Sequence, residues 1–496
     1  MQAAIKKVVI VGGGTAGWMS AALIKKVLAQ SVDIELVESD DIGIVGVGEA
    51  TIPPIQYVNQ VLGINEAEFL RETKSTLKLA IHFENWTQNG SSYYHTFGNA
   101  GANDPFCAFH HLVTRANTLG HNVSLWDYDL NYLCCEQQRC AKINTPDPVW
   151  DLPYAYHFDA GLYGQYLRKL SEKMGVKRTE GKITRVEQHP QSGNISALIL
   201  QNGQKIEGDL FIDCSGFRAL LLQQTLNTGY EDWSHWLPCN RAVAVASERF
   251  EQTLPYTRSI AHDAGWQWRI PLQHRNGNGL VYSSDFYSES QASDILMANL
   301  QTKALAEPRT LSFTTGRAKQ QWNKNVVAVG LASGFLEPLE STSIYLIQSA
   351  IVRLLKLFPH NGISPALMRE YNQQSQLEYE TIRDFIILHY TANQREGEFW
   401  RYLRDMPLPE RLAHKIELFK QSGQLTEDEL DIFKTSSWVQ VLIGQDIMPQ
   451  DYHPLANNLT AEQLKMYLQQ IQTKKHEPLS RIPLHDDYLK HIGALG

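Results

Sequence analysis

Short apolar runs and stretches with helical apolar spacing alternate along the start of the chain. Residues 8–11 (Val-Val-Ile-Val) are typical of a buried parallel strand, and the Ala/Leu/Ile pattern that follows predicts a helix packed against it. Residues 34–38 predict a second strand, and residues 55–75 predict further helix. Strand-type runs return at 210–213 and 326–329. This order predicts an α/β fold whose parallel sheet is assembled from separate parts of the chain.

The intervening segments are richer in strand patterns. Residues 77–83 alternate like a strand, and on periodicity alone Lys78 is a solvated lysine on the face opposite the leucines. Residues 93–98 predict a ring-rich loop that lines a pocket for an aromatic ligand or packs in the core. Trp266 and Trp268 lie two apart on a predicted strand, so both face the same side. From about residue 360 onward the pattern is mostly helical.

The turn after the first strand carries the glycine pattern Gly12-x-Gly14-x-x-Gly17. Gly12 permits the tight turn, Gly14 leaves room for a pyrophosphate to approach the backbone, and Gly17 lets the helix and strand pack closely. Glu38 ends the second strand about 20 residues later, where an acidic side chain accepts from a ribose hydroxyl. Strand, glycine loop, helix, strand and acid together predict a dinucleotide site.

Three separated segments favour FAD in an extended pose over a nicotinamide cofactor, which usually has a continuous domain. They are the glycine loop with Glu38, the strand that ends at Asp213, and the strand, loop and helix around Gly330. A loop at 44–54, punctuated by glycine and proline, would let the backbone approach a flat ring system. The predicted cofactor-binding residues are Gly12, Gly14, Thr15, Ala16, Gly17, Glu38, Gly48, Ala50, Asp213 and Gly330.

The predicted organisation is a discontinuous Rossmann-like FAD-binding domain made of residues 1–75, 159–225 and 313–358. A β-rich substrate region of residues 76–158 and 226–312 is inserted into it. Residues 359–496 are expected to form a helical C-terminal cap.

Composition narrows the class of function. Hydrophobic residues make up 43% of the chain and charged residues 20%, and the formal net charge of -8 gives no support to binding of nucleic acid or an acidic membrane. The N-terminus runs straight into the first strand without a secretory signal, and no apolar run is long enough to span a bilayer, so we expect a cytoplasmic protein. The six cysteines lack paired zinc spacing and are expected to be buried free thiols, with no metal site.

Several motifs occur in one order along the chain. They are Gly-Gly-Gly-Thr-Ala-Gly-Trp at 12–18, Lys78, Tyr-His-Thr-Phe-Gly at 94–98, Trp-x-Trp-x-Ile-Pro at 266–271 and Phe-Leu-Glu-Pro-Leu-Glu-Ser-Thr at 335–342. With these motifs most of the chain resembles the flavin-dependent tryptophan halogenases, close relatives of the flavin monooxygenases. The resemblance implies an enzyme that takes reduced FAD from a separate NAD(P)H-dependent flavin reductase. With O₂ and a halide, bromide or chloride, as co-substrates, it would form hypohalous acid and halogenate a small aromatic substrate.

The resemblance also implies roles for individual residues. Hypohalous acid would pass through a tunnel to Lys78, which hydrogen-bonds it or becomes its haloamine, and Glu340 would polarise that species or accept the proton lost from the arene. Ser341, Thr342 and Ser343 are suited to cap the next helix, so the halide is expected at backbone N–H groups near Thr342 and Ser343. The residues expected to line the substrate pocket and tunnel are His95, Phe97, Gly98, Trp266, Trp268, Ile270, Pro271 and Ser341.

The C-terminal part departs from the tryptophan-specific members of that family. Those members carry an aromatic and acidic segment that holds the amino-acid end of tryptophan, whereas residues 433–444 are shorter and lack it. Glu398-Phe399-Trp400 lies in a helical pattern that fits core packing better. We therefore expect an open pocket and a substrate such as indole, halogenated at its most reactive carbon, often C3. Bromide is expected to be preferred because it is the easier ion to oxidise.

Two other functions remain open. An FAD-dependent aromatic monooxygenase would transfer oxygen without halide, but it would leave Lys78, Trp266 and Trp268 unexplained. A non-catalytic flavin-fold binding protein would show no turnover and would tolerate replacement of Glu340. The sequence predicts no nucleic-acid or membrane partner, and it leaves open a monomer or a homodimer.

Overall fold

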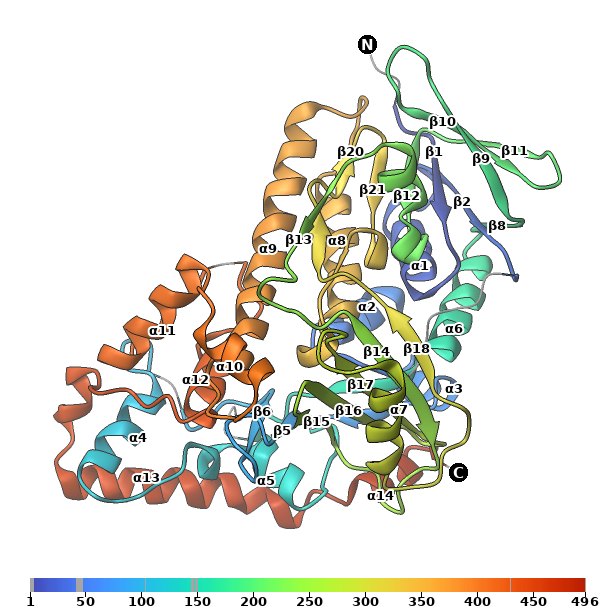
Figure 1. Ribbon diagram of the computed structural model, residues 1–496. Coiled ribbons are helices and arrows are strands. Elements are labelled where there is room, and N and C mark those ends of the chain that lie inside the picture. The colour runs from blue at the N-terminus through green and yellow to red at the C-terminus, as the bar shows by residue number, and fades with distance from the viewer. Residues whose placement is uncertain are drawn as a thin grey trace. The chain divides into compact units, whose positions relative to one another are not determined.

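A six-stranded sheet organises the first of two units into which the chain divides, Met1–Ser75 with Phe158–Asn240 and Leu311–Tyr379 (Figure 1). The computed structural model describes residues 4–41, 48–102, 104–143, 147, 150–428 and 430–495. The strand order is β20-β21-β12-β1-β2-β8. The strands are β1 (Lys7–Val11), β2 (Asp33–Glu38), β8 (Lys177–Glu180), β12 (Leu210–Asp213), β20 (Trp322–Asn323) and β21 (Val326–Ala328).

The centre of this sheet is parallel, as the sequence predicts. Strand β1 pairs in parallel with β2 and β12, β12 pairs in parallel with β21, and only the edge strand β20 is antiparallel to its neighbour. Val8, Val9 and Ile10 are fully buried, because strands covered on both faces read as continuous apolar runs. Helix α1 (Thr15–Leu28) packs against α6 (Ala160–Lys173) and α8 (Ser343–Lys356). The predicted α/β fold, with its sheet drawn from separate chain segments, is confirmed.

Two small antiparallel sheets and two short helices complete this unit. One sheet has the order β11-β10-β9 and extends from the edge of the unit in Figure 1, and the other has the order β13-β19-β22. Residues 55–75 form two helices rather than one, because Gly63 takes a left-handed conformation (φ 71°) that ends the first. These elements are β3 (Gly48–Ala50), α2 (Ile55–Leu62), α3 (Glu66–Glu72), β9 (Ile183–Gln188), β10 (Ile195–Leu200), β11 (Lys205–Glu207), η3 (Gly216–Arg218), η4 (Leu220–Thr225), β13 (Tyr230–Asp232), β19 (Gly316–Ala318), η5 (Gly330–Ala332), β22 (Gly334–Phe335) and η6 (Pro338–Glu340).

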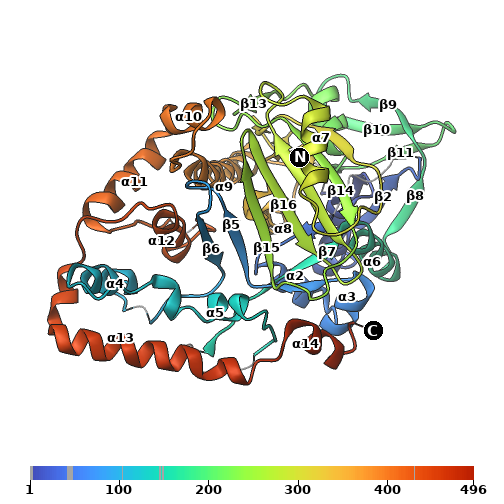
Figure 2. The same ribbon diagram turned by 60° about the horizontal axis from the view of Figure 1, so that its bottom comes forward.

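The second unit, Thr76–His157 with Arg241–Thr310 and Glu380–Gly496, is built on a larger sheet (Figure 2). Its strand order is β14-β17-β16-β15-β5-β6, with β18 beyond β14, and only the β15–β5 pair in this order is parallel. Helix α7 covers β14 and β17, and Leu296 packs there in an apolar cluster. The elements are β5 (Ala80–Glu84), β6 (Ser92–Thr96), β14 (Arg241–Ser247), β15 (Tyr256–His262), β16 (Gly265–Pro271), β17 (Asn276–Tyr282), α7 (Glu289–Ala298) and β18 (Arg309–Ser312).

Helices form most of the remainder, and residues from 360 on are mainly helical, as predicted. Phe399 and Trp400 are buried, so the core role expected for that segment is confirmed. The elements are β4 (Thr76–Lys78), α4 (Phe109–Thr118), η1 (Leu125–Tyr128), α5 (Leu130–Glu136), β7 (Ala155–Asp159), α9 (Pro365–Thr391), α10 (Glu398–Asp405), α11 (Glu410–Ser422), α12 (Thr435–Gly444), η7 (Pro454–Asn458), α13 (Ala461–His476), η8 (Glu477–Ser480) and α14 (His485–His491).

Three predictions about the second unit are wrong. Residues 77–83 do not form one strand. The strand is interrupted at Leu79, whose N–H donates to the Pro255 carbonyl oxygen (2.7 Å), and β4 and β5 belong to different sheets. Lys78 is therefore fully buried rather than solvated, because the face that alternation leaves to solvent is covered here. The aromatic stretch 93–98 is not a loop throughout, since its first part lies in β6, paired with β5.

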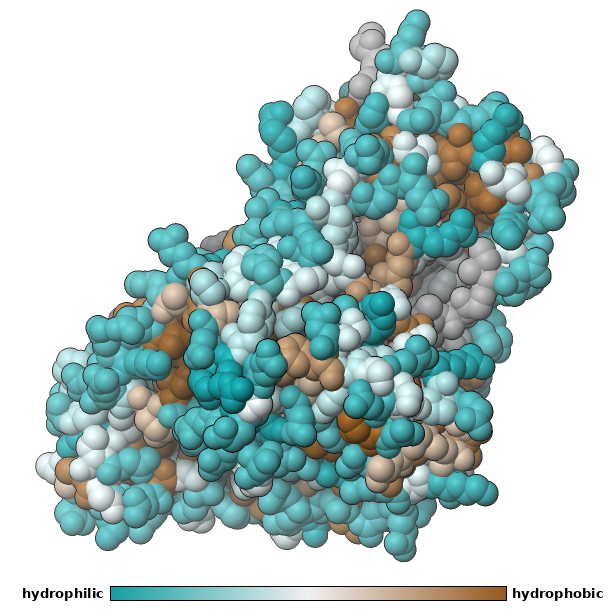
Figure 3. Space-filling model, in the orientation of Figure 1, coloured by the Kyte–Doolittle hydropathy of each residue, from teal (hydrophilic) through white to brown (hydrophobic). Residues whose placement is uncertain are grey.

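Figure 3 shows one face of the molecule, coloured by hydropathy. The face shown in Figure 3 is mostly hydrophilic, and its hydrophobic residues gather in small separate patches, as is normal for a protein surface. Within the described part of the chain, no helix combines the length and the apolar character needed to cross a membrane.

Candidate functional site

The glycine loop between β1 and α1 is closely packed at Gly12 and Gly17 and open at Gly14. A Cβ on Gly12, whose φ is 110°, would lie 2.3 Å from the Cys214 carbonyl oxygen. A Cβ on Gly17 would lie 1.8 Å from the Gly12 carbonyl oxygen. In contrast, a Cβ on Gly14 would have no atom of the described chain within 4 Å. Gly14 is also the N-cap of α1, whose first turn holds no acidic residue, so a phosphate group can approach there.

Glu38 lies against this loop, where the sequence predicts an acidic residue. Its carboxylate leaves no room for a side chain at position 13, since a Cβ on Gly13 would lie 1.3 Å from Glu38 Oε2. Arg178 on the neighbouring strand β8 donates from Nε to Glu38 Oε1 (2.6 Å) and also pairs with Asp40 (2.8 Å). No local pattern in the sequence indicates Arg178, because its contact to Glu38 depends on which strand lies beside β2. Arg178 fixes the orientation of the carboxylate beside the glycine loop.

The third predicted segment also reaches the glycine loop. Gly330, at φ 69°, lies so close to α1 that a Cβ there would be 2.9 Å from the Ala16 Cβ. The segments around Gly12, Glu38 and Gly330 therefore meet at the carboxyl ends of β1, β2 and β21, which is where open parallel sheets bind ligands. The described residues there fit a dinucleotide such as FAD.

Asp213, at the end of β12, is buried and makes its hydrogen bonds within the chain. Its Oδ1 accepts from the Ser215 N–H (3.1 Å) and hydroxyl (2.6 Å), and its Oδ2 accepts from the N–H groups of Leu221 (2.8 Å) and Leu222 (2.9 Å). These bonds shape the turn that follows β12 and begin the next helical segment. A contact from Asp213 to a cofactor stays a prediction.

Gly48 and Ala50 lie in the short strand β3, and Glu49 stands between them. The segment that precedes them, 42–47, lies outside the described residues, and it contains the first four residues of the predicted flat-ring loop at 44–54. Burial raises the pKa of the Glu49 carboxyl from 4.5 to about 7. No motif in the sequence indicated a titrating group at this position.

The pKa of Glu49 predicts a pH-dependent stability. Because the folded state holds this proton more tightly than the unfolded state, stability is greatest below about pH 4.5 and is lost as the pH rises through about 7. The variant Glu49→Gln stays neutral, so we expect it to exceed the wild type by about 1 to 3 kcal/mol at pH 8 and by almost nothing at pH 4. Urea unfolding at both pH values measures this difference. An equal difference at pH 4 and pH 8 would show that the carboxyl does not titrate as described.

In the second unit, Lys78 ends strand β4 and is enclosed by protein. Its Nζ lies 5.1 Å from the centroid of the Phe97 ring, close enough for a cation–π contact. Phe97 is held there because its N–H donates to the Leu79 carbonyl oxygen (3.0 Å). The structure thus brings together two predicted site residues, Lys78 and Phe97. A fully buried ionisable side chain beside another predicted site residue marks a candidate functional site, so this lysine is a functional candidate.

The Trp-x-Trp-x-Ile-Pro motif forms strand β16, buried along its whole length. The rings of Trp266 and Trp268 face the same side with centroids 6.2 Å apart, as predicted. Gly279 on β17 makes room for them, since a Cβ there would lie 2.0 Å from the Trp268 ring. The carbonyl of Pro271 accepts from the Thr76 hydroxyl (2.8 Å), which ties the motif to the strand that carries Lys78.

His95 lies on β6 in an aromatic cluster that the motifs did not reveal. Its ring centroid is 5.5 Å from that of Phe385 on α9 and 6.1 Å from that of Phe433, and these two phenylalanines stack at 3.9 Å. The sequence alone does not show this cluster because its members are hundreds of residues apart. Gly98 is also enclosed, because a Cβ there would lie 2.5 Å from the Asp129 carboxylate.

Glu340 and the expected halide-binding residues belong to the first unit. Glu340 ends η6 and is 1% exposed, and Ser341 follows in the left-handed conformation (φ 58°). The expected position of the cap is confirmed, since Thr342 is the N-cap of α8, but its backbone angles are helical (φ -90°, ψ -7°) and its side chain makes no cap hydrogen bond. Whether Glu340 meets Lys78, and whether Thr342 and Ser343 hold a halide, stay predictions.

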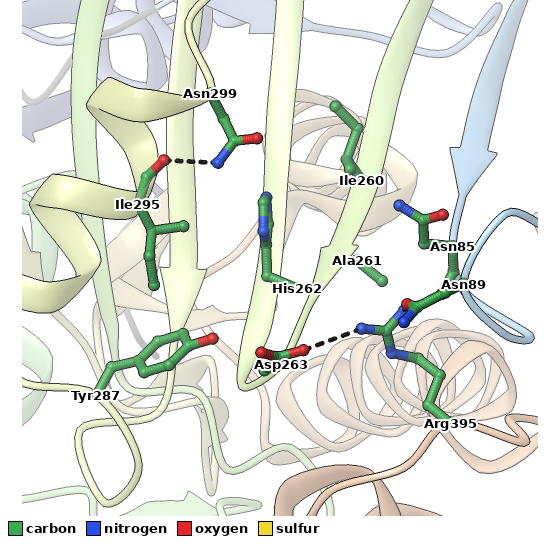
Figure 4. Close-up of a pocket in the computed structure, with 10 residues that line it drawn as sticks. All are labelled: Asn85, Asn89, Ile260, Ala261, His262, Asp263, Tyr287, Ile295, Asn299 and Arg395. Carbon is green, nitrogen blue, oxygen red and sulfur yellow. Dashed lines mark hydrogen bonds and ion pairs between the residues drawn. The ribbon is translucent and has the colours of Figure 1, made fainter.

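A separate polar cavity of about 360 Å³ lies in the second unit at the β15–β16 turn (Figure 4). Arg395 and Asp263 face each other across it, with 3.6 Å between Nη2 and Oδ1. None of the predicted site residues lines this cavity. All six cysteines are buried free thiols, as expected, and the described residues show no cluster of His, Cys, Asp and Glu suited to a metal.

The parallel sheet, the glycine loop and the acid at the end of β2 are typical of a dinucleotide-binding fold of the Rossmann type. The family model for tryptophan halogenase matches residues 7–461, so the chain belongs to the tryptophan halogenase family. This confirms the resemblance drawn from the motifs, and it makes the protein an enzyme of the flavin-dependent halogenase class.

Similar proteins span nearly the whole chain. It is 36% identical to the tryptophan 6-halogenase SttH of Streptomyces toxytricini over 84% of each chain, and 32% identical to the tryptophan 7-halogenase RebH of Lentzea aerocolonigenes over 92% of each. Among solved structures, Xcc4156, a flavin-dependent halogenase from Xanthomonas campestris, has a TM-score of 0.96 at 46% identity and covers 99% of this chain and 98% of its own. BrvH, a flavin-dependent halogenase from Brevundimonas sp. BAL3, has a TM-score of 0.95 at 40% identity and covers 98% of this chain and 99% of its own.

Proposed function

We propose that this protein is an FADH₂-dependent halogenase that uses O₂ to oxidise bromide or chloride and halogenates an electron-rich aromatic such as indole. The observation that carries the proposal is the fully buried Lys78 beside Phe97, in the unit that contains the Trp-x-Trp-x-Ile-Pro strand. The overall reaction joins hypohalous acid to the arene: a carbon–halogen bond replaces a carbon–hydrogen bond, and the oxygen leaves as water. A separate NAD(P)H-dependent reductase would supply the reduced flavin.

The residues that would hold FAD lie in the first unit. The open position at Gly14 and the N-terminus of α1 receive the pyrophosphate, and Glu38 accepts from a ribose hydroxyl. Thr15, Ala16, Gly48 and Gly330 bring backbone close to the cofactor. When bound, the reduced flavin would supply two of the electrons that reduce O₂ and the halide the other two, so that one oxygen atom would enter hypohalous acid and the other would leave as water.

Lys78 acts on the oxidised halogen. Its ammonium donates a hydrogen bond to hypohalous acid, which makes the halogen more electrophilic. Alternatively, the ammonium first loses a proton, and the amine then takes the halogen from hypohalous acid: an N–halogen bond replaces an N–H bond, the halogen–oxygen bond breaks, and the oxygen leaves as water. Burial favours either role because water does not compete for the donor or consume the oxidant. Glu340 takes the proton that leaves the arene, which a buried carboxylate does well as a general base.

The start of α8 is the proposed halide site. A 14-residue helix directs its first N–H groups toward the region of Thr342 and Ser343, and no acidic residue lies in its first turn. Backbone amides hold chloride or bromide alike, and bromide is the easier to oxidise, so we propose that bromide reacts faster.

The proposed substrate follows from the structure of residues 433–444. Most of this segment forms α12, in which Trp438 is buried. The centroid of the Trp438 ring lies 4.9 Å from that of the Phe385 ring and 4.3 Å from Lys415 Nζ. Gln440 accepts from the Thr96 N–H (2.7 Å), which fastens α12 to β6. The segment is therefore used for packing, which supports a pocket without a clamp for the amino-acid end of tryptophan.

This substrate proposal predicts a preference in competition. With flavin reductase, FAD, NADH and bromide, equal concentrations of indole and tryptophan should give bromoindole in at least about tenfold excess, with bromine on C3. The reason is that an open pocket leaves the choice of carbon to the reactivity of the ring. Liquid chromatography with mass spectrometry measures both products. Tryptophan brominated as fast as indole, at C6 or C7, would contradict the open pocket.

A further inference from the structure

A network of buried polar side chains surrounds strand β4, which carries Lys78. His157 on β7, opposite Thr76 in the strand pair, joins two threonines: its Nδ1 is 3.0 Å from Thr76 Oγ1 and its Nε2 is 2.9 Å from Thr257 Oγ1. The Thr76 hydroxyl also donates to the Pro271 carbonyl oxygen (2.8 Å). Both His157 and Thr76 are fully buried, so these bonds do not exchange with water.

The directions of these bonds follow from their acceptors. Because a carbonyl oxygen only accepts, the Thr76 proton goes to Pro271, and the Thr76 oxygen accepts from the Nδ1–H of His157. The His157 Nε2 then has a free lone pair and accepts from the Thr257 hydroxyl. The neutral imidazole of His157 is thus fully satisfied in one tautomer.

A second histidine reaches β4 from α14, near the end of the chain. His485 Nδ1 faces the Thr253 carbonyl oxygen (3.2 Å) and must donate to it. Its Nε2 therefore carries the lone pair, and it accepts from the backbone N–H of Leu77 (3.1 Å), the residue before Lys78. A protonated His485 would turn an N–H toward the Leu77 N–H, so this geometry requires the neutral ring. Burial lowers the pKa of His485 to about 4, which agrees with that requirement.

The two imidazoles are close enough to Lys78 to affect its surroundings. Burial lowers the pKa of His157 well below 6.5, and the nearby positive charge of Lys78 lowers it further. Both rings are therefore neutral beside the lysine at ordinary pH, and they fix the backbone of β4 without adding positive charge. A side chain that passes a halogen to a ring needs such a fixed position, since a displacement of about 1 Å costs about 10²-fold in rate.

We propose that His485 is a positioning residue for Lys78: its Nε2 holds the Leu77 N–H and thereby sets where the lysine amine meets the oxidised halogen. The proposal rests on the proposed halogenase function. It assigns to a residue about 400 positions away in sequence a role in the delivery step, although His485 itself touches neither halogen nor substrate in this role.

Two amide substitutions separate the two hydrogen bonds of His485. In His485→Gln the side-chain oxygen reaches the place of Nε2 and keeps the Leu77 bond, whereas in His485→Asn the shorter amide reaches only the place of Nδ1 and keeps the Thr253 bond. His491→Asn, an exposed change on the same helix, is the matched control. For each protein we would measure kcat and KM for indole bromination, hypobromous acid released to a thiol trap, flavin reoxidation and the thermal midpoint.

The expected result is a split between the two variants. His485→Asn loses kcat by about tenfold or more, keeps KM and flavin reoxidation, and releases more hypobromous acid, while His485→Gln and His491→Asn stay within about threefold of the wild type. If Asn and Gln variants halogenate equally well, or lose activity equally with equal falls in thermal midpoint, His485 does not position Lys78. A wild type that yields no halogenated product overturns the proposed function as well. If the wild type halogenates and a variant without Lys78 does not, the proposed function stands, and only the role of His485 is overturned.

Discussion

Lys78→Met abolishes halogenation while leaving flavin oxidation unchanged. Methionine keeps the length and volume of the buried side chain but has no amine to donate to hypohalous acid or to become a haloamine. We expect kcat for halogenation to fall by at least about 10³-fold, because the step at the arene loses its activating group. In the proposed reaction hypohalous acid forms before that step, so we expect its formation to continue and the acid to escape into solution.

The measurement combines three readings from one reaction. Halogenated indole is measured by mass spectrometry, released hypohalous acid by a thiol trap, and flavin turnover by NADH consumption through the reductase. Lys465→Met, an exposed change on α13 in the same unit, controls for loss of a positive charge. Halogenation by Lys78→Met at more than a tenth of the wild-type rate would remove the lysine from the mechanism.

Substitutions of the glycine loop should separate folding from cofactor binding. In Gly12→Ala the new Cβ meets the Cys214 carbonyl oxygen at 2.3 Å, and the backbone is held at φ 110°, which L side chains rarely adopt. We expect this variant to lose about 2 kcal/mol or more of folding free energy and to bind no flavin. In Gly14→Ala the new Cβ meets no described atom within 4 Å, and φ is -76°, so the fold should keep its stability.

Flavin binding distinguishes these two glycines further. Because the open space at Gly14 is where a pyrophosphate would approach the backbone, Gly14→Ala should weaken FAD binding by about tenfold at unchanged thermal stability. Titration of flavin fluorescence gives the dissociation constant, and a thermal melt without flavin gives the stability. If Gly14→Ala binds FAD as tightly as the wild type, the cofactor does not use this loop as proposed.

The parts of the fold that could be predicted are those in which local pattern and tertiary position agree. The run at 8–11 is apolar on both faces because β1 is central in a parallel sheet, and Gly12 follows because the chain must turn there. The prediction of one strand at residues 77–83 failed because there the local pattern and the tertiary position disagree. Alternation predicts a strand with one solvent-exposed face. In the structure β4 and β5 belong to different sheets and both faces are covered by protein, so Lys78 is buried.

The candidate site shows the same division. Gly14 and Glu38 lie within a recognisable motif and Lys78 is singled out by the family resemblance, so roles for all three could be proposed from short stretches of sequence. Arg178 and His485 could not be found that way, because each acts through a contact with a residue far along the chain. Such contacts depend on strand order and helix packing, which no local pattern encodes.

The most direct test of the central claim is the product that the wild-type enzyme forms from indole with flavin reductase, FAD, NADH and O₂, in the presence and absence of bromide. The account predicts a product with the isotope doublet of bromine that appears only with bromide and carries bromine at C3. A product heavier by one oxygen, formed equally without halide, would show an aromatic monooxygenase. No product under either condition would contradict halogenation of indole altogether.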